Sequence, residues 1–407
     1  MSTLREGHTA TLLPSGEVLV AGGLGTNYLP SAELYDPRTR SWRPVASMKK
    51  SRVGHTATLL TNGQVLVAGG FDGTSGNLLS SSEIFDPTNG TWADAGSMST
   101  VRGQQTATLL QDSRVLIVGG DHLISQAITN VDLYDPAVGW APAQFLNNAR
   151  FRHTATLLSD GTVLVTGGSV AGKAINTVEV FSNGRWAFTN GLSTPRAGHS
   201  ATLLPDGRVL VASGSTTNGQ VASSEVFDPM SGSWTPAGNL HDAREDHTAL
   251  LLTNGITLVI GGDYYVGGGP VMLPWAEVWE PTGGRWRQIS QLNTPRIWHT
   301  ATLLPDGTVL VLGGYNTQEG YLSSAEIYID QPPPIVIGSV TSTSNAVTLG
   351  FTNLPGSVNR IVASSNLELT ASQWIAIGTA TEVLPGQFQF TDSVAGGSSS
   401  RFYRVRW

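Results

Sequence analysis

The 407-residue chain contains no cysteine, and its only lysines are Lys49, Lys50 and Lys173. The absence of cysteine excludes a disulfide framework, a thiolate metal site and a cysteine nucleophile. Acidic residues number 30 against 23 basic ones, which gives a net charge of −7. Because nucleic-acid binding depends largely on neutralising phosphates, this charge excludes a nucleic acid as the expected partner.

Long hydrophobic runs are also missing, and none approaches the roughly 18 apolar residues of a membrane-spanning helix. The first residues, MSTLREGHT, lack the apolar centre of a signal peptide. Charged residues make up only 13% of the chain, whereas glycines number 48. Since glycine weakens helices and supplies tight turns, this composition favours strands and turns over helices.

One phrase occurs seven times along the chain. It reads REGHTATLLPSGEVLVAGG at its first occurrence and RIWHTATLLPDGTVLVLGG at its last. A period of about 50 residues is typical of repeat architectures, in which each unit needs its neighbours to bury its faces. The copies begin at Arg5, Arg52, Arg102, Arg150, Arg196, Arg244 and Arg296.

Each repeat predicts four strands. The segment HTATLL alternates small polar and apolar residues, and a turn such as Asn62-Gly63 then predicts a hairpin. The following VLVAGG is almost wholly apolar, which predicts a strand buried on both faces. A third strand, such as SAELYDP, ends at Asp-Pro. A lone tryptophan marks the fourth strand in six repeats: Trp42, Trp92, Trp140, Trp186, Trp234 and Trp286.

The combination of Arg-x-x-His, Gly-Gly, Tyr-Asp-Pro and Trp resembles the kelch repeat. The resemblance covers Arg5 to about Asp330 and implies that residues 1–330 form an all-β, seven-bladed β-propeller of the galactose-oxidase-like superfamily. The seventh repeat ends at SAEIYID without a tryptophan strand. We expect that strand to come from an upstream segment or from Ile335–Val340. The opening MSTLR also copies MSTVR at 98–102, which predicts a missing upstream piece.

A change in composition marks a second domain. Residues 331–334, QPPP, predict a stiff extended linker. Short apolar segments at regular spacing in residues 335–407 predict a small antiparallel β-sandwich. This tail resembles C-terminal β modules of exported bacterial proteins, which pair an internal tryptophan with a terminal FYRV. The resemblance implies an extracellular or cell-surface location.

The recurrent Arg-x-x-His pairs suggest a structural role, because residues present in every repeat cannot make one unique site. Each arginine is matched by one acid in the third strand, which predicts a ring of buried ion pairs. The glycine pairs do not predict a dinucleotide site, since no helix follows them. The matching acids are Glu33, Glu83, Asp132, Glu179, Glu225, Glu277 and Glu326.

Ligand-binding residues are expected in two sets of loops that differ between repeats. One set joins the second and third strands, and the other leads from the tryptophan strand to the next repeat. The resemblance implies that these loops surround one mouth of the propeller. Aromatic rings and carboxylates there suit a sugar or an extended peptide. The candidates are Arg152, Asp246, Asp263, Tyr264, Tyr265, Trp275, Trp298, Tyr315 and Glu319.

Three functional hypotheses remain open at this stage. The first is a monomeric, non-catalytic module that binds a glycan or a protein through the loop rim, without a cofactor or metal. The second is a carbohydrate-active enzyme resembling the kelch sugar mutarotases, with Arg152, Asp246, Asp263 and Glu319 as candidates for proton transfer. The third is an intracellular kelch adaptor, which the lack of a preceding helical domain disfavours.

The copper oxidase mechanism is not supported. Galactose oxidase needs copper, a cysteine–tyrosine cross-link and histidine ligands that include one from its C-terminal domain. This chain has no cysteine, and its last histidine is His299. Asp121-His122 is a neighbouring pair of possible metal ligands, but it lacks the further ligands that a metal requires.

Overall fold

The computed structural model describes residues 1–73, 77–122, 126–266, 269–281, 283–328, 336–343, 346–352, 360–364, 374–384, 387–393 and 402–406. Every helix or strand within these ranges is a β-strand, which confirms the all-β prediction. The chain divides into two compact units, one formed by residues 1–37 and 41–328 and the other by residues 38–40 and 329–407.

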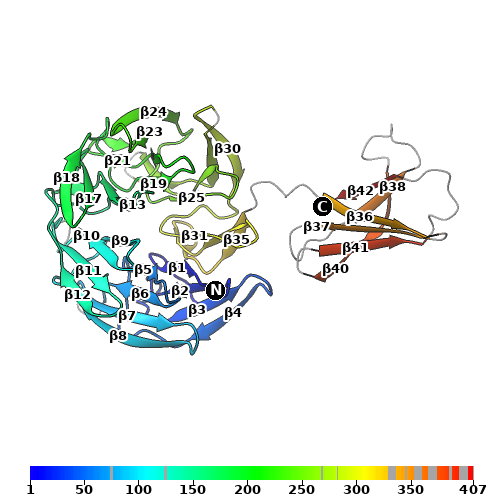
Figure 1. Ribbon diagram of the computed structural model, residues 1–407, viewed down its shortest axis with the longest axis horizontal. Coiled ribbons are helices and arrows are strands. Elements are labelled where there is room, and N and C mark those ends of the chain that lie inside the picture. The colour runs from blue at the N-terminus through cyan, green and yellow to red at the C-terminus, as the bar shows by residue number, and fades with distance from the viewer. Residues whose placement is uncertain are drawn as a thin grey trace. The chain divides into compact units, whose positions relative to one another are not determined.

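The described residues of the first unit form seven antiparallel sheets of three or four strands, numbered here by repeat, that follow one another around a ring (Figure 1). Sheet 1 consists of β1 (Thr9–Leu12), β2 (Val18–Ala21), β3 (Ala32–Asp36) and β4 (Ser41–Val45). Sheet 2 consists of β5 (Thr56–Leu59), β6 (Val65–Ala68), β7 (Ser81–Asp86) and β8 (Thr91–Ser97). Sheet 3 consists of β9 (Thr106–Leu109), β10 (Val115–Val118), β11 (Val131–Asp135) and β12 (Gly139–Pro142).

The ring continues with the same order of strands. Sheet 4 consists of β13 (Thr154–Leu157), β14 (Val163–Thr166), β17 (Val178–Ser182) and β18 (Arg185–Thr189). Sheet 5 consists of β19 (Ser200–Leu203), β20 (Val209–Ala212), β23 (Ser223–Asp228) and β24 (Ser233–Asn239). Sheet 6 consists of β25 (Thr248–Leu251), β26 (Thr257–Ile260), β29 (Trp275–Glu280) and β30 (Arg285–Gln291). Sheet 7 has three strands, β31 (Thr300–Leu303), β32 (Val309–Leu312) and β35 (Ala325–Tyr328).

Four of the loops between second and third strands form short hairpins of their own. They are β15–β16 (Ser169–Val170 and Lys173–Ala174), β21–β22 (Ser215–Thr216 and Gly219–Gln220), β27–β28 (Asp263–Val266 and Gly269–Met272) and β33–β34 (Tyr315–Asn316 and Gly320–Tyr321). These hairpins belong to repeats 4 to 7.

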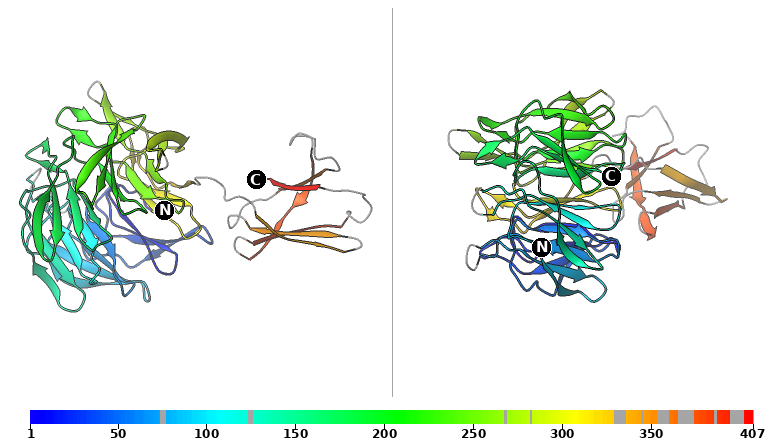
Figure 2. Two further views of the ribbon diagram at one scale, coloured as in Figure 1. Left: turned by 45° about the horizontal axis from the view of Figure 1, so that its top comes forward. Right: turned by 60° about the vertical axis from the view of Figure 1, so that its left-hand side comes forward.

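The core lies between neighbouring sheets. Figure 2 shows these sheets from two further directions. The second strand of every repeat is buried along its whole length, as its apolar sequence predicts. Val18 and Val20 of sheet 1 pack in one cluster with Leu310 and Leu312 of sheet 7. Each fully buried aliphatic side chain contributes about 1.5–3 kcal/mol. The same kind of packing that joins consecutive sheets therefore also closes the ring.

The tryptophan strands cover the outer part of the ring. Trp42 lies opposite Tyr35 in the β3–β4 register, and the two ring centroids are 4.9 Å apart. Equivalent aromatic pairs recur in sheets 2 to 5. The indole Nε1 of Trp92 donates to the carbonyl of Ala46 in the preceding repeat. The predicted fourth strands are thus confirmed, and their tryptophans join one sheet to the next.

The second unit contains two sheets in its described residues. One has the order β36 (Val336–Ser342), β37 (Val347–Thr352), β41 (Gln387–Asp392) and β40 (Thr381–Leu384). The other has the order β39 (Ile375–Thr379), β38 (Arg360–Ser364) and β42 (Phe402–Arg406). Because β36 pairs with β37, the expectation that this segment completes sheet 7 is wrong for residues 336–340. The proline linker at 331–334 and Ile335 lie outside the described residues.

Candidate functional site

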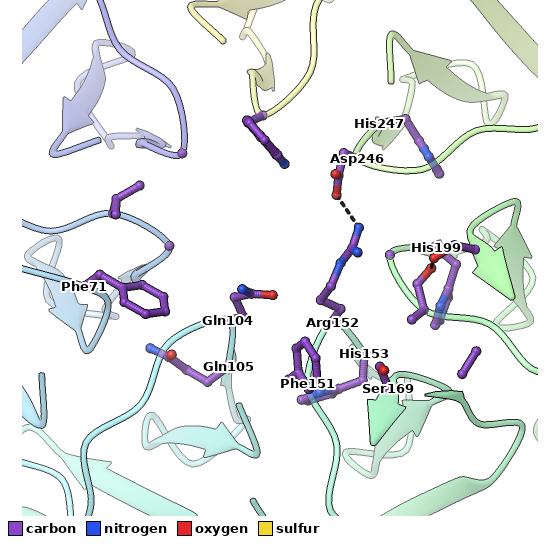
Figure 3. A pocket seen from close by; sticks show the side chains of 18 of the residues that line it. Phe71, Gln104, Gln105, Phe151, Arg152, His153, Ser169, His199, Asp246 and His247 are labelled. Carbon is purple, nitrogen blue, oxygen red and sulfur yellow. Dashed lines mark hydrogen bonds and ion pairs between the residues drawn. The ribbon is translucent and has the colours of Figure 1, made fainter. Parts of the chain in front are cut away.

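A cavity of about 860 Å³ lies where the inner edges of the sheets meet. Its wall is built mainly by the two residues between Arg and His in the recurring Arg-x-x-His stretch. The residues that follow the glycine pairs, such as Phe71 and Ser169, complete it. Figure 3 shows side chains from several repeats that point into this space. Both predicted sets of loops therefore contribute residues to the same cavity.

The arginine of each stretch fixes the backbone at the cavity wall. Arg150 is fully buried, and its guanidinium donates to the carbonyls of Gly167 and Thr177 and to the carboxylate of Glu179. All seven arginines form the equivalent ion pair, which confirms the predicted ring. The pairs are Arg5–Glu33, Arg52–Glu83, Arg102–Asp132, Arg150–Glu179, Arg196–Glu225, Arg244–Glu277 and Arg296–Glu326.

The second residue after each arginine has a left-handed backbone. Three repeats place glycine there, namely Gly7, Gly54 and Gly198, with φ between 56° and 62°. The other four repeats place a side chain in the same conformation: Gln104 (φ 51°), Arg152 (φ 53°), Asp246 (φ 53°) and Trp298 (φ 51°). This conformation costs a non-glycine residue about 1–2 kcal/mol. All four side chains line the cavity.

Arg152 crosses the cavity wall from repeat 4 to repeat 6. Its Nη2 lies 2.6 Å from Glu245 Oε2 and 2.7 Å from Asp246 Oδ1, and Figure 3 shows the contact with Asp246. A Cβ atom on the intervening Gly198 would lie only 2.7 Å from the same Nη2. The glycine of repeat 5 is therefore what leaves room for the arginine to reach the two carboxylates.

A second layer of contacts supports this cluster. The Nε2 of Gln220 donates to Glu245 Oε1 at 2.7 Å, and the backbone N–H of Tyr265 donates to the Gln220 Oε1. Asp263 is buried, and its Oδ1 has no hydrogen-bond partner within the described part of the chain. Burial, together with the nearby charges of Asp246 and Glu245, raises the pKa of Asp263 to about 7.

Asp246 also has a raised pKa, because burial outweighs the attraction of Arg152. Arg152 has a raised pKa, since the two carboxylates outweigh its burial. The ion pairs thus keep Arg152 charged at every physiological pH. Two carboxylates face its positive charge.

Histidines form the deeper part of the wall. The Nε2 of each shares a hydrogen bond with a threonine or serine hydroxyl of the preceding sheet, as in His55–Thr9 (3.1 Å) and His8–Thr300 (3.0 Å). Burial lowers the pKa of His55, His153, His247 and His299 to about 3. It lowers the pKa of His8 and His199 well below the ordinary value. These rings are therefore neutral links between sheets and add no charge to the cavity.

The candidate residues predicted from the sequence occupy different places. Arg152, Asp246 and Trp298 line the cavity, and Asp263 is buried next to Asp246. The remaining candidates do not line the cavity. Tyr264 and Tyr265 lie on β27, and Trp275 is the first residue of β29. Tyr315 and Glu319 belong to the β33–β34 hairpin.

Sequence reasoning missed Glu6, Gln104 and Glu245. Aligning the seven stretches was enough to find Gln104, because it replaces the glycine of Arg-x-Gly-His in repeat 3. Glu6 and Glu245 occupy the first variable position, where the other repeats have small or apolar residues. A charged residue at a position that is small or apolar in the other repeats is the sequence signal that points to Glu6 and Glu245.

The side chains present do not fit a copper site. Within the described ranges, no group of three or more histidine, aspartate or glutamate side chains is arranged to hold a metal ion. Asp121 is buried with an unpartnered Oδ1, and His122 Nδ1 approaches the carbonyl of Val101 at 3.3 Å. The two residues therefore do not form part of a larger set of ligands.

Comparisons with known proteins agree with this architecture. The family model described as the kelch motif matches residues 9–49 and 52–99, which correspond to the first two repeats. The first two repeats therefore match the kelch motif, in agreement with the resemblance seen in the sequence. None of the curated proteins compared with this propeller matches it.

Two solved structures resemble this chain in fold. One is a fungal alcohol oxidase of the AA5 family in complex with copper, with 17% identity and a TM-score of 0.64 over 97% of this chain and 91% of the oxidase. The other is YjhT, with 14% identity and a TM-score of 0.55 over 71% of this chain and 98% of YjhT. At these identities the similarity shows the fold alone.

Proposed function

We propose that the propeller is a binding module that holds a sugar unit of a glycan in the central cavity. A kelch propeller supports a binding or scaffold role in general. The observation that carries the glycan proposal is the set of four strained residues, Gln104, Arg152, Asp246 and Trp298. Strained backbone that persists around a cavity is typical of functional sites. Three other repeats avoid this backbone strain by placing glycine at the same position. We therefore infer that the four side chains are retained for a function in the cavity, despite the strain.

The chemistry of these side chains suits a polyhydroxylated ligand. The Gln104 amide both donates and accepts hydrogen bonds, and the Asp246 carboxylate accepts them from hydroxyl groups. The indole of Trp298 and the rings of Phe71 and Phe151 offer apolar faces for the C–H surfaces of a sugar ring. A volume of about 860 Å³ is within the usual range for ligand sites.

Binding to a glycan array, followed by calorimetric titration of the strongest hit, tests this proposal. We expect Trp298→Ala to weaken binding at least tenfold, because Trp298 lines the cavity and the residue is 46% exposed. Phe188→Ala is the matched control, since Phe188 is an exposed aromatic residue on the outer strand β18. Equal affinity in both variants, or no hit on the array, would overturn the proposal.

The alternative is a carbohydrate-active enzyme of the mutarotase or isomerase kind, and one observation favours it. Asp263 has a pKa of about 7 and a buried oxygen without a partner, which suits proton donation and acceptance near neutral pH. Proton NMR of reducing sugars is the test. Faster exchange between anomers with the native protein, and its loss in Asp263→Asn, would establish turnover.

The proposal includes an extracellular or cell-surface location, supported by the sequence resemblance of residues 335–407 to modules of exported bacterial proteins. Fractionation of the producing cells, with detection by an antibody against the propeller, tests it. No helix in the described part of the chain is long and apolar enough to cross a membrane.

A further inference from the structure

Glu6 is a buried carboxylate in the cavity wall that lacks a counter-ion. Glu6 is 7% exposed and lines the cavity. Its Oε2 atom has no hydrogen-bond partner among the described residues. Glu245 occupies the same position in repeat 6, where Arg152 and Gln220 satisfy both of its oxygens. Burial alone accounts for the rise in the pKa of Glu6 to about 7. An unpaired buried carboxylate is costly unless something supplies the missing partner.

Aromatic residues lie near the Glu6–Gly7 segment. The backbone N–H of Gly7 donates to the carbonyl of Trp298 at 3.0 Å, which places Trp298 next to the Glu6–Gly7 segment. The rings of Trp298 and Tyr315 are 6.5 Å apart, and Tyr315 meets Tyr321 edge to face at 5.6 Å. The charge of Glu6 contributes to the raised pKa of Tyr321, behind burial as the main cause. Aromatic faces next to a carboxylate are the usual surroundings of a bound ammonium group.

The charges of the cavity wall point to the same kind of ligand. Arg152 is already paired with two carboxylates. The histidines of the wall are neutral because burial lowers their pKa values far below 6.5. Glu6 is therefore left as an acid without a cation, in a wall that contains no free positive charge among its described residues.

We propose that the ligand is an amino sugar, whose ammonium group takes the place of the missing partner of Glu6 in the cavity wall that Glu6 shares with Trp298. This inference rests on the proposed binding of a glycan in the same cavity, and it adds the charge of the ligand. The sugar ring occupies the central cavity, and the ammonium group donates to the Glu6 carboxylate.

The experiment is calorimetric titration of the full chain with three β-1,4-linked tetrasaccharides of equal length. One consists of glucosamine, one of N-acetylglucosamine and one of glucose. We expect the glucosamine tetramer to bind about tenfold more tightly than the other two, since a charge-assisted contact with a desolvated carboxylate adds at least that factor. Glu6→Gln keeps the size of the side chain and is expected to remove the preference.

Glu17→Gln is the matched control. Glu17 pairs with Arg43 outside the cavity, so this variant changes the net charge equally and is expected to retain the preference. A preference lost in both variants, or retained in Glu6→Gln, overturns the proposal. Equal binding of all three tetramers by the native chain overturns it as well, while the glycan proposal stands. If no glycan binds, including those of the array, the glycan proposal itself fails. Thermal melting of each variant, compared with the native chain, shows whether a loss of binding reflects a loss of folding.

Discussion

The strain at the cavity wall can be measured with one pair of substitutions in adjacent repeats. Gln104 has a φ of 51°, its side chain is exposed, and it makes no side-chain hydrogen bond within the described ranges. Gln104→Gly therefore removes strain without removing a stabilising contact. The left-handed conformation costs about 1–2 kcal/mol, and the freer unfolded chain of a glycine variant offsets about 0.4–1 kcal/mol of that gain. The expected net gain in the free energy of unfolding is about 0.5–1 kcal/mol.

Gly54→Ala is the reverse experiment. Gly54 has a φ of 62°, and a Cβ atom there would lie 3.9 Å from Phe71, which is ordinary van der Waals contact. The substitution therefore introduces the strain without a collision, and we expect a loss of about 0.5–1 kcal/mol.

Differential scanning calorimetry of both variants checks the pair of predictions. Gln104→Gly should raise the unfolding midpoint of the propeller and Gly54→Ala should lower it, each by about 1–3 °C. Shifts of the same sign in the two variants would refute the reasoning, because they would show that the left-handed backbone is not what distinguishes the two positions.

Three further predictions concern the ring. Arg150→Met leaves Glu179 buried without its cation and should cost about 3–5 kcal/mol in chemical denaturation; a loss below about 1 kcal/mol would contradict the buried pair. Since the histidine pKa values of about 3 lie below the ordinary 6.5, protonation favours the unfolded chain. The histidine contribution to stability should thus be complete above pH 6.5 and fall as the pH drops towards 3. His153→Gln, which copies Gln105, should therefore show a weaker dependence on pH over this range in melts at several pH values. Gly198→Ala should displace Arg152 and weaken sugar binding in calorimetric titration, whereas Gly54→Ala should leave it nearly unchanged.

The parts of the fold that depend on local pattern could be predicted from the sequence. The seven ion pairs follow from one arginine and one acid in each repeat, and each pair joins residues of the same repeat. The tryptophan strands follow in the same way, because each tryptophan lies opposite the aromatic residue of its own third strand.

The candidate site was only partly predictable, because its contacts join distant repeats. The partner of Glu245 is Arg152, 93 residues earlier, and no local pattern shows that Glu6 lacks such a partner. Tyr264 and Tyr265 were selected for the length and aromatic content of their loop. That loop folds back on itself as the β27–β28 hairpin, and Tyr265 is exposed there instead of lining the cavity.

The hydrogen bond between His8 and Thr300 joins sheets 1 and 7 in the same way as the histidine hydrogen bonds that join consecutive sheets. The contact between the first and last sheets is therefore equivalent to the other contacts around the ring. The N-terminal amino group bonds to the carbonyl of Ser323, just before β35. A circular permutant that begins at residue 51, and joins residue 328 to Met1 through a short glycine linker, should therefore fold to the same ring. The order of the repeats along the gene is then separable from their order around the axis, which allows single repeats to be exchanged without moving the cavity wall.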